Sequence, residues 1–263
     1  MTESIGARID NHSHIIHADI RDIVNAAKAN GLAEYSITEH VSQFRQLKES
    51  VRFGSVHTSG RVFASINEYV REFDKVDGQT LGMRVCRGLE VDFAPRFETK
   101  VADFVNQSEW DILLCSVHEF ENARDVERIV GKRYGPERAF EDWRDYLRLQ
   151  QLALESDFVP FQVLAHPVRM SRGVEQVPPE LDLLLLDLAK SSKRRRKALE
   201  LNGNDIDYAP QLVRRLAKAC SEAGCVVSLG SDSHHPRDVY KNVGKCESLV
   251  AEFNLGLFQA GSG

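Results

Sequence analysis

The stretch ARIDNHSHIIHADIRDIVNAAKANGLAEYSI, residues 7–37, holds the pattern that decides the fold. It contains a short apolar run, Ala7–Ile9, then an amphipathic segment, Ile20–Ala29, and a second apolar run, Tyr35–Ile37. Short apolar runs indicate buried strands, whereas apolar residues that recur every three to four positions indicate a helix. A strand, a helix and a second strand joined by short connections predict a parallel βαβ unit.

This alternation continues through the rest of the chain. The further apolar runs are Met83–Leu89, Trp110–Cys115, Phe161–Ala165, Ala198–Leu201 and Cys225–Leu229. The further amphipathic segments are Val62–Val76, Phe97–Asn106, Glu137–Leu154, Glu180–Lys190, Pro210–Ala223 and Arg237–Phe253. Strands that alternate with helices in this way predict a parallel sheet, most simply closed into a barrel. An open doubly wound sheet is the alternative, because periodicity alone does not show closure.

The chain is long enough for one large α/β domain. Of its 263 residues, 42% are hydrophobic and 28% are charged, as in an ordinary globular protein. We expect a single domain over residues 1–258 and a disordered tail over Gln259–Gly263. Two polar stretches interrupt the alternation, Val41–Arg61 and Glu119–Pro136, and the first is a candidate loop over the mouth of an active site.

Charge and composition exclude several functional classes. The net charge of -5 argues against a general nucleic-acid or membrane-surface binder. No run of about 18 apolar residues occurs, and the N-terminus lacks the apolar segment of a signal peptide. The 5 cysteines are odd in number and show no CxxC spacing, which favours a reducing, cytoplasmic environment. We expect no membrane or nucleic-acid partner, and the oligomeric state stays open.

One strongly basic run, KSSKRRRK at Lys190–Lys197, contrasts with the net negative charge of the chain. Clustered cations can neutralise the phosphates of a nucleic acid. They also occur at solvated helix ends, where they offset the negative pole of the helix dipole. The run follows an apolar helix and precedes a strand, so we interpret it as a helix end on the barrel face opposite the strand ends.

The first strand ends in a pair of histidines with metal-binding spacing. In DNHSH, residues 10–14, His12 and His14 are two positions apart on an extended segment. Their side chains therefore point to one face and can chelate a single ion.

Other predicted strands also end in residues that bind metals: Glu39 and His40, Glu90, His118, His166, and Asp232 with His234. The carboxyl ends of parallel strands form the active-site face of barrels and related α/β folds. Scattered surface histidines would have no reason to occupy these positions. The pattern therefore predicts one metal site to which nearly the whole chain contributes.

These motifs resemble the polymerase and histidinol phosphatase superfamily, usually called the PHP superfamily. The resemblance begins with HSH, AAKANGL and ITEH within residues 10–40, where Glu39 departs from the more usual TDH. It continues in the same order through GLE at 88–90, SVH at 116–118, AHP at 165–167 and GSDSH at 230–234. In length and in its ELN segment, residues 200–202, the chain is closest to the histidinol-phosphate phosphatases. The resemblance implies an α/β fold, a distorted seven-stranded (β/α)7 barrel.

The resemblance also implies three divalent metal ions, with Zn, Mn and Fe as the candidates. The ligands that it implies are His12 and His14 with Glu90 and Asp232 for one ion, and His118 and His166 with a bridging Glu90 for a second. For the third ion they are His40 and His234. A position that is Asp or His in relatives falls near Asp19, with His17 as the alternative. Imidazole suits all three metals and carboxylates tolerate the harder ions, so the ligand chemistry does not choose among them.

Such a site predicts a metal-dependent phosphatase. Divalent ions with a bridging water supply hydroxide near neutral pH and neutralise an anionic substrate, which suits attack on the phosphorus of a small phosphomonoester. Asp232, His234 and Asp19 are the candidates for the catalytic proton donor. Arg169, Arg172, Arg237 and His235 are the candidates for substrate binding. The alternatives are a phosphodiesterase or nucleotide phosphatase on the same site, and a non-catalytic metal-binding protein.

Overall fold

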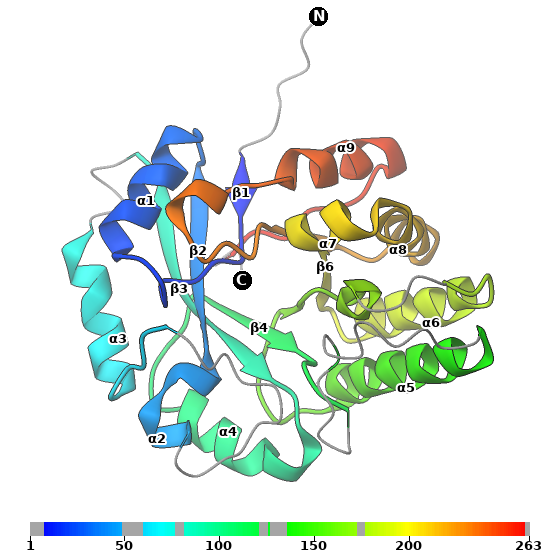
Figure 1. The fold of residues 1–263 in the computed structure, drawn as a ribbon, viewed down its shortest axis with the longest axis horizontal. Helices are drawn as coiled ribbons and strands as arrows, with labels where there is room; N and C mark the ends of the chain where they lie inside the picture. Colours follow the sequence, from blue (N-terminus) through cyan, green and yellow to red (C-terminus); the bar gives the residue numbers. More distant parts are fainter. Residues whose placement is uncertain are drawn as a thin grey trace, which may run out of the picture.

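The computed structural model describes residues 8–48, 60–76, 82–120, 126, 136–172 and 177–260. Its strands lie in the middle of the molecule and its helices are arranged around them (Figure 1). The strands are β1 (Ile9–Asp10), β2 (Glu34–His40), β3 (Arg84–Asp92), β4 (Ile112–Ser116), β5 (Val163–Leu164), β6 (Ala198–Asn202) and β7 (Val227–Gly230). Each pairs in parallel with the next in the order β1-β2-β3-β4-β5-β6-β7, so all seven predicted strands are present.

The last strand returns to the first. The Asn11 N–H donates to the Leu229 carbonyl at 2.8 Å, and the Asp232 N–H donates to the His12 carbonyl at 2.8 Å. The sheet is therefore a nearly closed barrel, as expected for the (β/α)7 fold, and the alternative of an open doubly wound sheet is wrong. Both β1 and β5 have only 2 residues, which makes the barrel irregular.

The helices that surround the barrel follow the predicted amphipathic segments. They are α1 (Ile20–Ala29), α3 (Ile66–Glu72), α4 (Glu98–Val105), α5 (Pro136–Glu155), α6 (Leu181–Arg194), α8 (Pro210–Ala223) and α9 (Val243–Phe253). In α1 the buried residues are Ile20, Ile23, Val24 and Ala27, a spacing that places them on one face of the helix against the core. A short helix that was not predicted, α7 (Gly203–Tyr208), lies between β6 and α8.

The polar interruptions are only partly within the described residues. The stretch that begins at Val41 starts with the 3₁₀-helix η1 (Val41–Gln43) and the short helix α2 (Arg45–Lys48), and its Phe44 and Leu47 are buried. This part is core rather than loop, while residues 49–59 lie outside the described part, so a cover over the site stays a prediction. In the second stretch, residues 121–125 and 127–135 also lie outside it.

The described chain extends beyond the predicted domain end at residue 258. Ala260 is buried, its N–H donates to Glu34 Oε1 at 2.9 Å, and its carbonyl accepts from Arg84 at 2.6 Å. Residues 261–263 of the predicted tail lie outside the described part.

Two observations concern possible partners of the protein: the ion pairs of the basic run and the character of the helices. Within the basic run at the end of α6, Arg194 pairs with Glu155 and Arg195 pairs with Asp157, so these two cations have acidic partners. None of the helices in the described part of the chain has the length and apolar character that crossing a membrane requires.

Candidate metal centre

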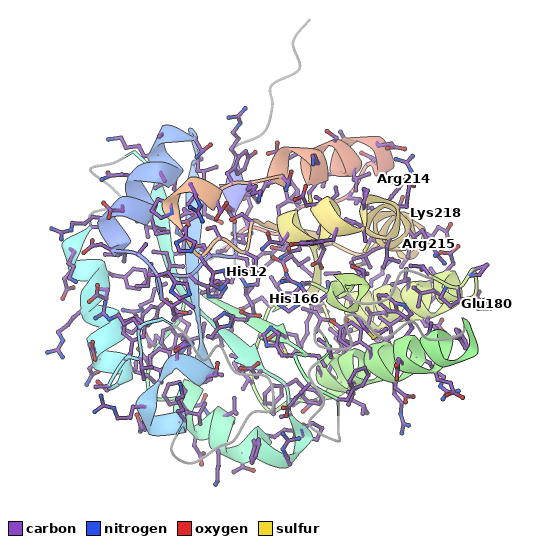
Figure 2. All side chains as sticks on the ribbon, in the orientation of Figure 1. His12, His166, Glu180, Arg214, Arg215 and Lys218 are labelled. Carbon is purple, nitrogen blue, oxygen red and sulfur yellow. The ribbon has the colours of Figure 1, made fainter. Side chains whose placement is uncertain are left out.

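All eight predicted ligands lie at the carboxyl ends of strands and face one another inside the barrel. His12 and His14 follow β1, His40 ends β2, Glu90 lies in β3, and His118 and His166 follow β4 and β5. Asp232 and His234 follow β7. His12, after β1, and His166, after β5, both lie near the centre of the molecule (Figure 2). Barrel closure thus brings together side chains from most of the chain.

Glu90 occupies the centre of this cluster. Its Oε1 lies 2.8 Å from His166 Nε2 and 3.3 Å from His118 Nε2. Its Oε2 lies 2.7 Å from His40 Nδ1, 3.3 Å from His12 Nε2 and 3.6 Å from His14 Nε2. Both oxygens of one buried carboxylate therefore face imidazoles, which is the arrangement that a bridging ligand needs.

Asp232 contributes a second central carboxylate. Its Oδ1 lies 3.3 Å from His14 Nε2 and 3.7 Å from His12 Nε2, while its Oδ2 accepts from Arg169 at 2.6 Å. Asp232 has φ 54 and His166 has φ 31, in the left-handed region that residues other than glycine rarely adopt. Such local strain at two members of one cluster is typical of functional sites.

The ligand atoms form three overlapping groups. The groups are His14 with His40 and His234, His12 with His14 and Asp232, and His12 with Glu90 and His166, each with its atoms within 4.8 Å of one another. This division differs from the expected one in four respects. His14 also joins the His40 and His234 group, and His12 also joins the Glu90 and His166 group. Glu90 is absent from the His12, His14 and Asp232 group, and His118 belongs to none of the three, although it contacts Glu90.

Behind the histidines lies a layer of buried carboxylates; the sequence predicted Glu39 at this end of the sheet but predicted no role at the site for Glu200 or Asp92. Glu200 Oε1 lies 2.9 Å from His12 Nδ1, Asp92 Oδ1 lies 2.5 Å from His118 Nδ1, and Glu39 Oε1 lies 3.4 Å from His14 Nδ1. Carboxylates in this position fix the orientation of an imidazole and raise its basicity as a ligand. For Asp92 the signal in the sequence was alternation: it is two positions after Glu90, so both point to the same face of β3.

The carboxylates change the protonation of the imidazoles. Burial alone lowers the pKa of His12, but Glu200, Glu90 and Asp232 together raise it well above its ordinary value. In the same way, burial lowers the pKa of His14 while Asp232 and Glu39 raise it, to about 8. For His166, burial and the nearby Arg169 guanidinium lower the pKa to about 4, so this imidazole is neutral at pH 7.

The central carboxyl groups respond in the opposite direction. Burial raises the pKa of Glu90, but His40, His12 and His118 hold it well below its usual range. Burial likewise raises the pKa of Asp232, and Arg169 with His12 holds it well below its usual range. Asp232 is thus an ionised carboxylate at neutral pH, which suits its predicted role as a metal ligand better than its predicted role as a proton donor.

Asp19 does not join the cluster. It is the N-cap of α1, where its carboxylate accepts from the Arg21 backbone and guanidinium, both at 2.9 Å, and its side chain is 34% exposed. Its predicted roles as ligand and as catalytic acid are therefore replaced by a structural one. His17 is better placed, because its ring lies 6.3 Å from the ring of His234 and 5.3 Å from that of His235.

The arginines predicted to bind substrate have different positions. Arg169 is buried between Asp205 and Asp232 and is not presented to solvent, which corrects its predicted role. Arg237 lies on the surface with 80% of its side chain exposed, beside Asp238. Arg172 ends the 3₁₀-helix η4 (Arg169–Arg172), and its side chain lies outside the described part. His235 is partly exposed and stacks on His17, at the edge of the cluster.

Comparison with known proteins gives consistent matches over most of the chain. The family model of the PHP domain matches residues 10–204. The histidinol-phosphatase of Lactococcus lactis is 23% identical over 257 residues, covering 91% of this chain and 88% of the relative. The probable histidinol-phosphatase of Deinococcus radiodurans is 28% identical over 239 residues, covering 83% of this chain and 81% of the relative.

Among solved structures, the fold is similar to that of the Lactococcus lactis histidinol phosphate phosphatase in complex with zinc, L-histidinol and phosphate. The TM-score is 0.79 at 20% sequence identity, with 96% of each chain covered. This similarity agrees with the seven-stranded barrel described above.

Proposed function

Because the chain belongs to the PHP domain family, we propose that it is a metal-dependent phosphatase that hydrolyses a small phosphomonoester resembling histidinol phosphate. One observation carries this proposal: histidines and carboxylates from six strand ends converge on Glu90 and Asp232 in overlapping groups with metal-binding spacing. The relatives named as histidinol-phosphatases support the choice of substrate class.

The residues of the cluster fit divalent cations. Its buried carboxyl groups are Glu39, Glu90, Asp92, Glu200, Asp205 and Asp232, and its buried guanidinium is Arg169. Such an excess of acidic groups away from water is costly unless cations compensate it. Both ring nitrogens of His14 are buried and make no hydrogen bond of suitable geometry to any residue in the described part. An imidazole left in this state is ready to bind a metal.

We propose three ions, divided according to the three groups of ligand atoms, with Zn, Mn or Fe as the metal. When bound, such ions neutralise a phosphate and lower the pKa of water, which supplies a nucleophile near neutral pH. His118 would complete the shell of the ion beside Glu90 and His166, because its Nε2 lies 3.3 Å from Glu90 Oε1. His17 takes precedence over Asp19 as a further ligand at the edge of the cluster.

Side chains of the protein would orient the metal ligands, donate a proton and contact the leaving group. Glu200 and Asp92 hold the rings of His12 and His118 so that Nε2 of each faces Glu90. His234 is 23% exposed, the most of the eight predicted ligands, and is our candidate for giving a proton to the leaving oxygen of the substrate. His235 and His17 stand next to it, where they can contact the leaving group.

The test is a hydrolysis assay on chelator-treated protein to which Zn or Mn is added back. We expect release of phosphate from L-histidinol phosphate and from p-nitrophenyl phosphate, and no recovery of activity when the metal is withheld. Asp232→Asn should abolish the recovery, whereas Asp207→Asn, on the half-exposed end of α7 beside Lys245, should leave it unchanged.

Two outcomes would overturn the proposal. Cleavage of bis-p-nitrophenyl phosphate or a short oligonucleotide, with monoesters untouched, would favour a phosphodiesterase on the same site. Bound metal without hydrolysis of any ester in a broad panel would favour a metal-binding protein.

A further inference from the structure

A buried chain of three charged side chains lies beside the proposed metal centre. Arg169 Nε is 2.8 Å from Asp205 Oδ1, and Arg169 Nη2 donates to Asp232 Oδ2 at 2.6 Å. All three side chains are at most 5% exposed. Asp205 is the outer member of this chain, and no ligand group contains it.

The three residues come from three successive connections of the barrel. Arg169 begins η4 after β5, Asp205 lies in α7 after β6, and Asp232 follows β7. The start of α7 is itself held in place, because the Asn202 side chain accepts from the N–H groups of Asn204 and Asp205. Asn204 Nδ2 also donates to the Asp232 carbonyl at 3.1 Å. The helix α7 therefore reaches Asp232 both through the Asn204 side chain, which binds the Asp232 backbone carbonyl, and through Arg169.

The two oxygens of Asp232 have different partners. Oδ2 is taken by Arg169, whereas Oδ1 faces Nε2 of His12 and of His14. A planar guanidinium that is held from both sides has a defined orientation, so it leaves only Oδ1 to an ion.

Charge adds a second reason for the presence of Asp205. A pair of Arg169 and Asp232 alone would be neutral, and its carboxylate would attract a cation weakly. With Asp205 the three side chains carry a net negative charge, so Asp232 keeps its attraction for a divalent ion. A buried guanidinium also needs more than one acceptor to compensate for its lost hydration.

We propose that Asp205 is a positioning residue for the metal centre: it holds and neutralises Arg169, which in turn presents Oδ1 of Asp232 to the ion shared with His12 and His14. The proposal rests on the proposed function, because it assumes that divalent ions bind in this cluster. It assigns to the first turn of α7 a role in metal affinity.

The experiment compares zinc binding by wild type, Asp205→Asn and Asp207→Asn, measured by competition with a chromophoric chelator. Removing an outer partner of a metal ligand commonly weakens metal binding about 10- to 100-fold, and we expect such a loss for one ion in D205N. D207N is the matched control, since it removes the same charge from the same helix at a half-exposed site. Equal zinc affinity in D205N and wild type would overturn the proposal.

A double-mutant cycle separates positioning from a general loss of stability. If Asp205 acts through Arg169, D205N should have little further effect on zinc affinity in an Arg169→Gln background. Independent, additive losses would contradict the proposal. Should D205N fail to fold, Arg169→Lys keeps the charge but cannot span two carboxylates, so it should show the same loss; wild-type affinity in R169K would overturn the proposal.

Zinc affinity is read without any substrate, which keeps the two proposals distinguishable. Weakened zinc binding in D205N, in a protein whose wild type hydrolyses no phosphoester, would uphold the positioning role and reject the phosphatase. Normal zinc binding in D205N, in a protein whose wild type is an active phosphatase, would reject the positioning role and uphold the phosphatase.

Discussion

Replacing Glu200 with glutamine tests whether the carboxylates behind the histidines control the metal centre. Glu200 is buried, and its two oxygens have separate tasks: Oε1 lies 2.9 Å from His12 Nδ1, and Oε2 accepts from the His166 N–H at 2.6 Å. An amide of the same shape has only one acceptor oxygen. In E200Q one of these contacts is therefore lost. The NH₂ group of the amide faces either the His166 N–H, which is itself a donor, or His12 Nδ1, which can accept only if the imidazole changes its tautomer.

The magnitude follows from these two contacts. A buried donor left without its partner costs about 1–3 kcal/mol, so we expect the free energy of unfolding of the metal-free protein to fall by that amount. Weaker orientation of His12 should lower zinc affinity by about 10- to 100-fold. That loss corresponds to about 1.4 to 2.8 kcal/mol of binding free energy.

Chemical denaturation of the chelator-treated protein measures the first quantity, and competition with a chromophoric chelator measures the second. Glu222→Gln is the matched control, because Glu222 is half-exposed and pairs only loosely with Lys218 at 3.6 Å. If E200Q had wild-type zinc affinity, the assignment of Glu200 as a support for His12 would be refuted.

The pH dependence supplies a further check. Burial raises the pKa of Glu200, but His12 and His166 hold it below its usual value of 4.5. A carboxyl group whose pKa is lowered in the folded state contributes stability above its unfolded pKa, and this contribution disappears as the pH falls through the folded value. The difference in unfolding free energy between wild type and E200Q should accordingly be full above pH 4.5 and shrink in acid.

Three other expectations can be checked with the same preparations. Gly230→Ala should weaken zinc binding, because the added methyl group would collide with Glu200 Oε1 and His12 Cβ; affinity equal to wild type in a competition titration would argue against it. Glu90→Gln should lower the number of zinc ions retained per chain, measured by elemental analysis after dialysis, because its two oxygens face separate groups of histidines; full retention would show that Glu90 is not a bridge. The pKa of His14, which burial lowers but Asp232 and Glu39 raise to about 8, predicts two opposite trends as the pH rises from 6.5 to 8. The melting temperature of the metal-free protein should fall, since a raised histidine pKa contributes stability that is lost over this interval, while zinc affinity should rise as the competing proton leaves; trends of the same sign would contradict this protonation.

Most of the fold could be predicted because its signals are local. Each strand is a short apolar run followed by an amphipathic segment, and this contrast can be read within a few residues of the sequence. The segment at residues 203–208 shows the limit, because α7 is too short for a periodic pattern and depends on Asn202, whose side chain caps its first turn. Burial of Phe44 and Leu47 was missed for a related reason, since a few apolar residues within a polar stretch give no periodicity.

Asp19 and Arg169 show why the role of a side chain could not be predicted from its residue type and its position near a motif. Asp19 stands five positions after His14, a spacing compatible with a ligand, yet it is equally well placed to cap α1. Arg169 follows a histidine turn and has the chemistry to bind phosphate, but Asp205 and Asp232 enclose it. Which partner such a side chain finds depends on elements far away in the sequence.

The sequence by itself determined the seven strands and which histidines and carboxylates stand at their carboxyl ends, because the end of an apolar run and the residue that follows it are properties of neighbouring positions. Only the tertiary structure decided how these ligands are grouped, which carboxylate stands behind each imidazole, and how Arg169 is held. Those contacts join residues far apart in the sequence, such as His12 and Asp232, and they exist only because the closing of β7 onto β1 brings the two ends of the barrel into register.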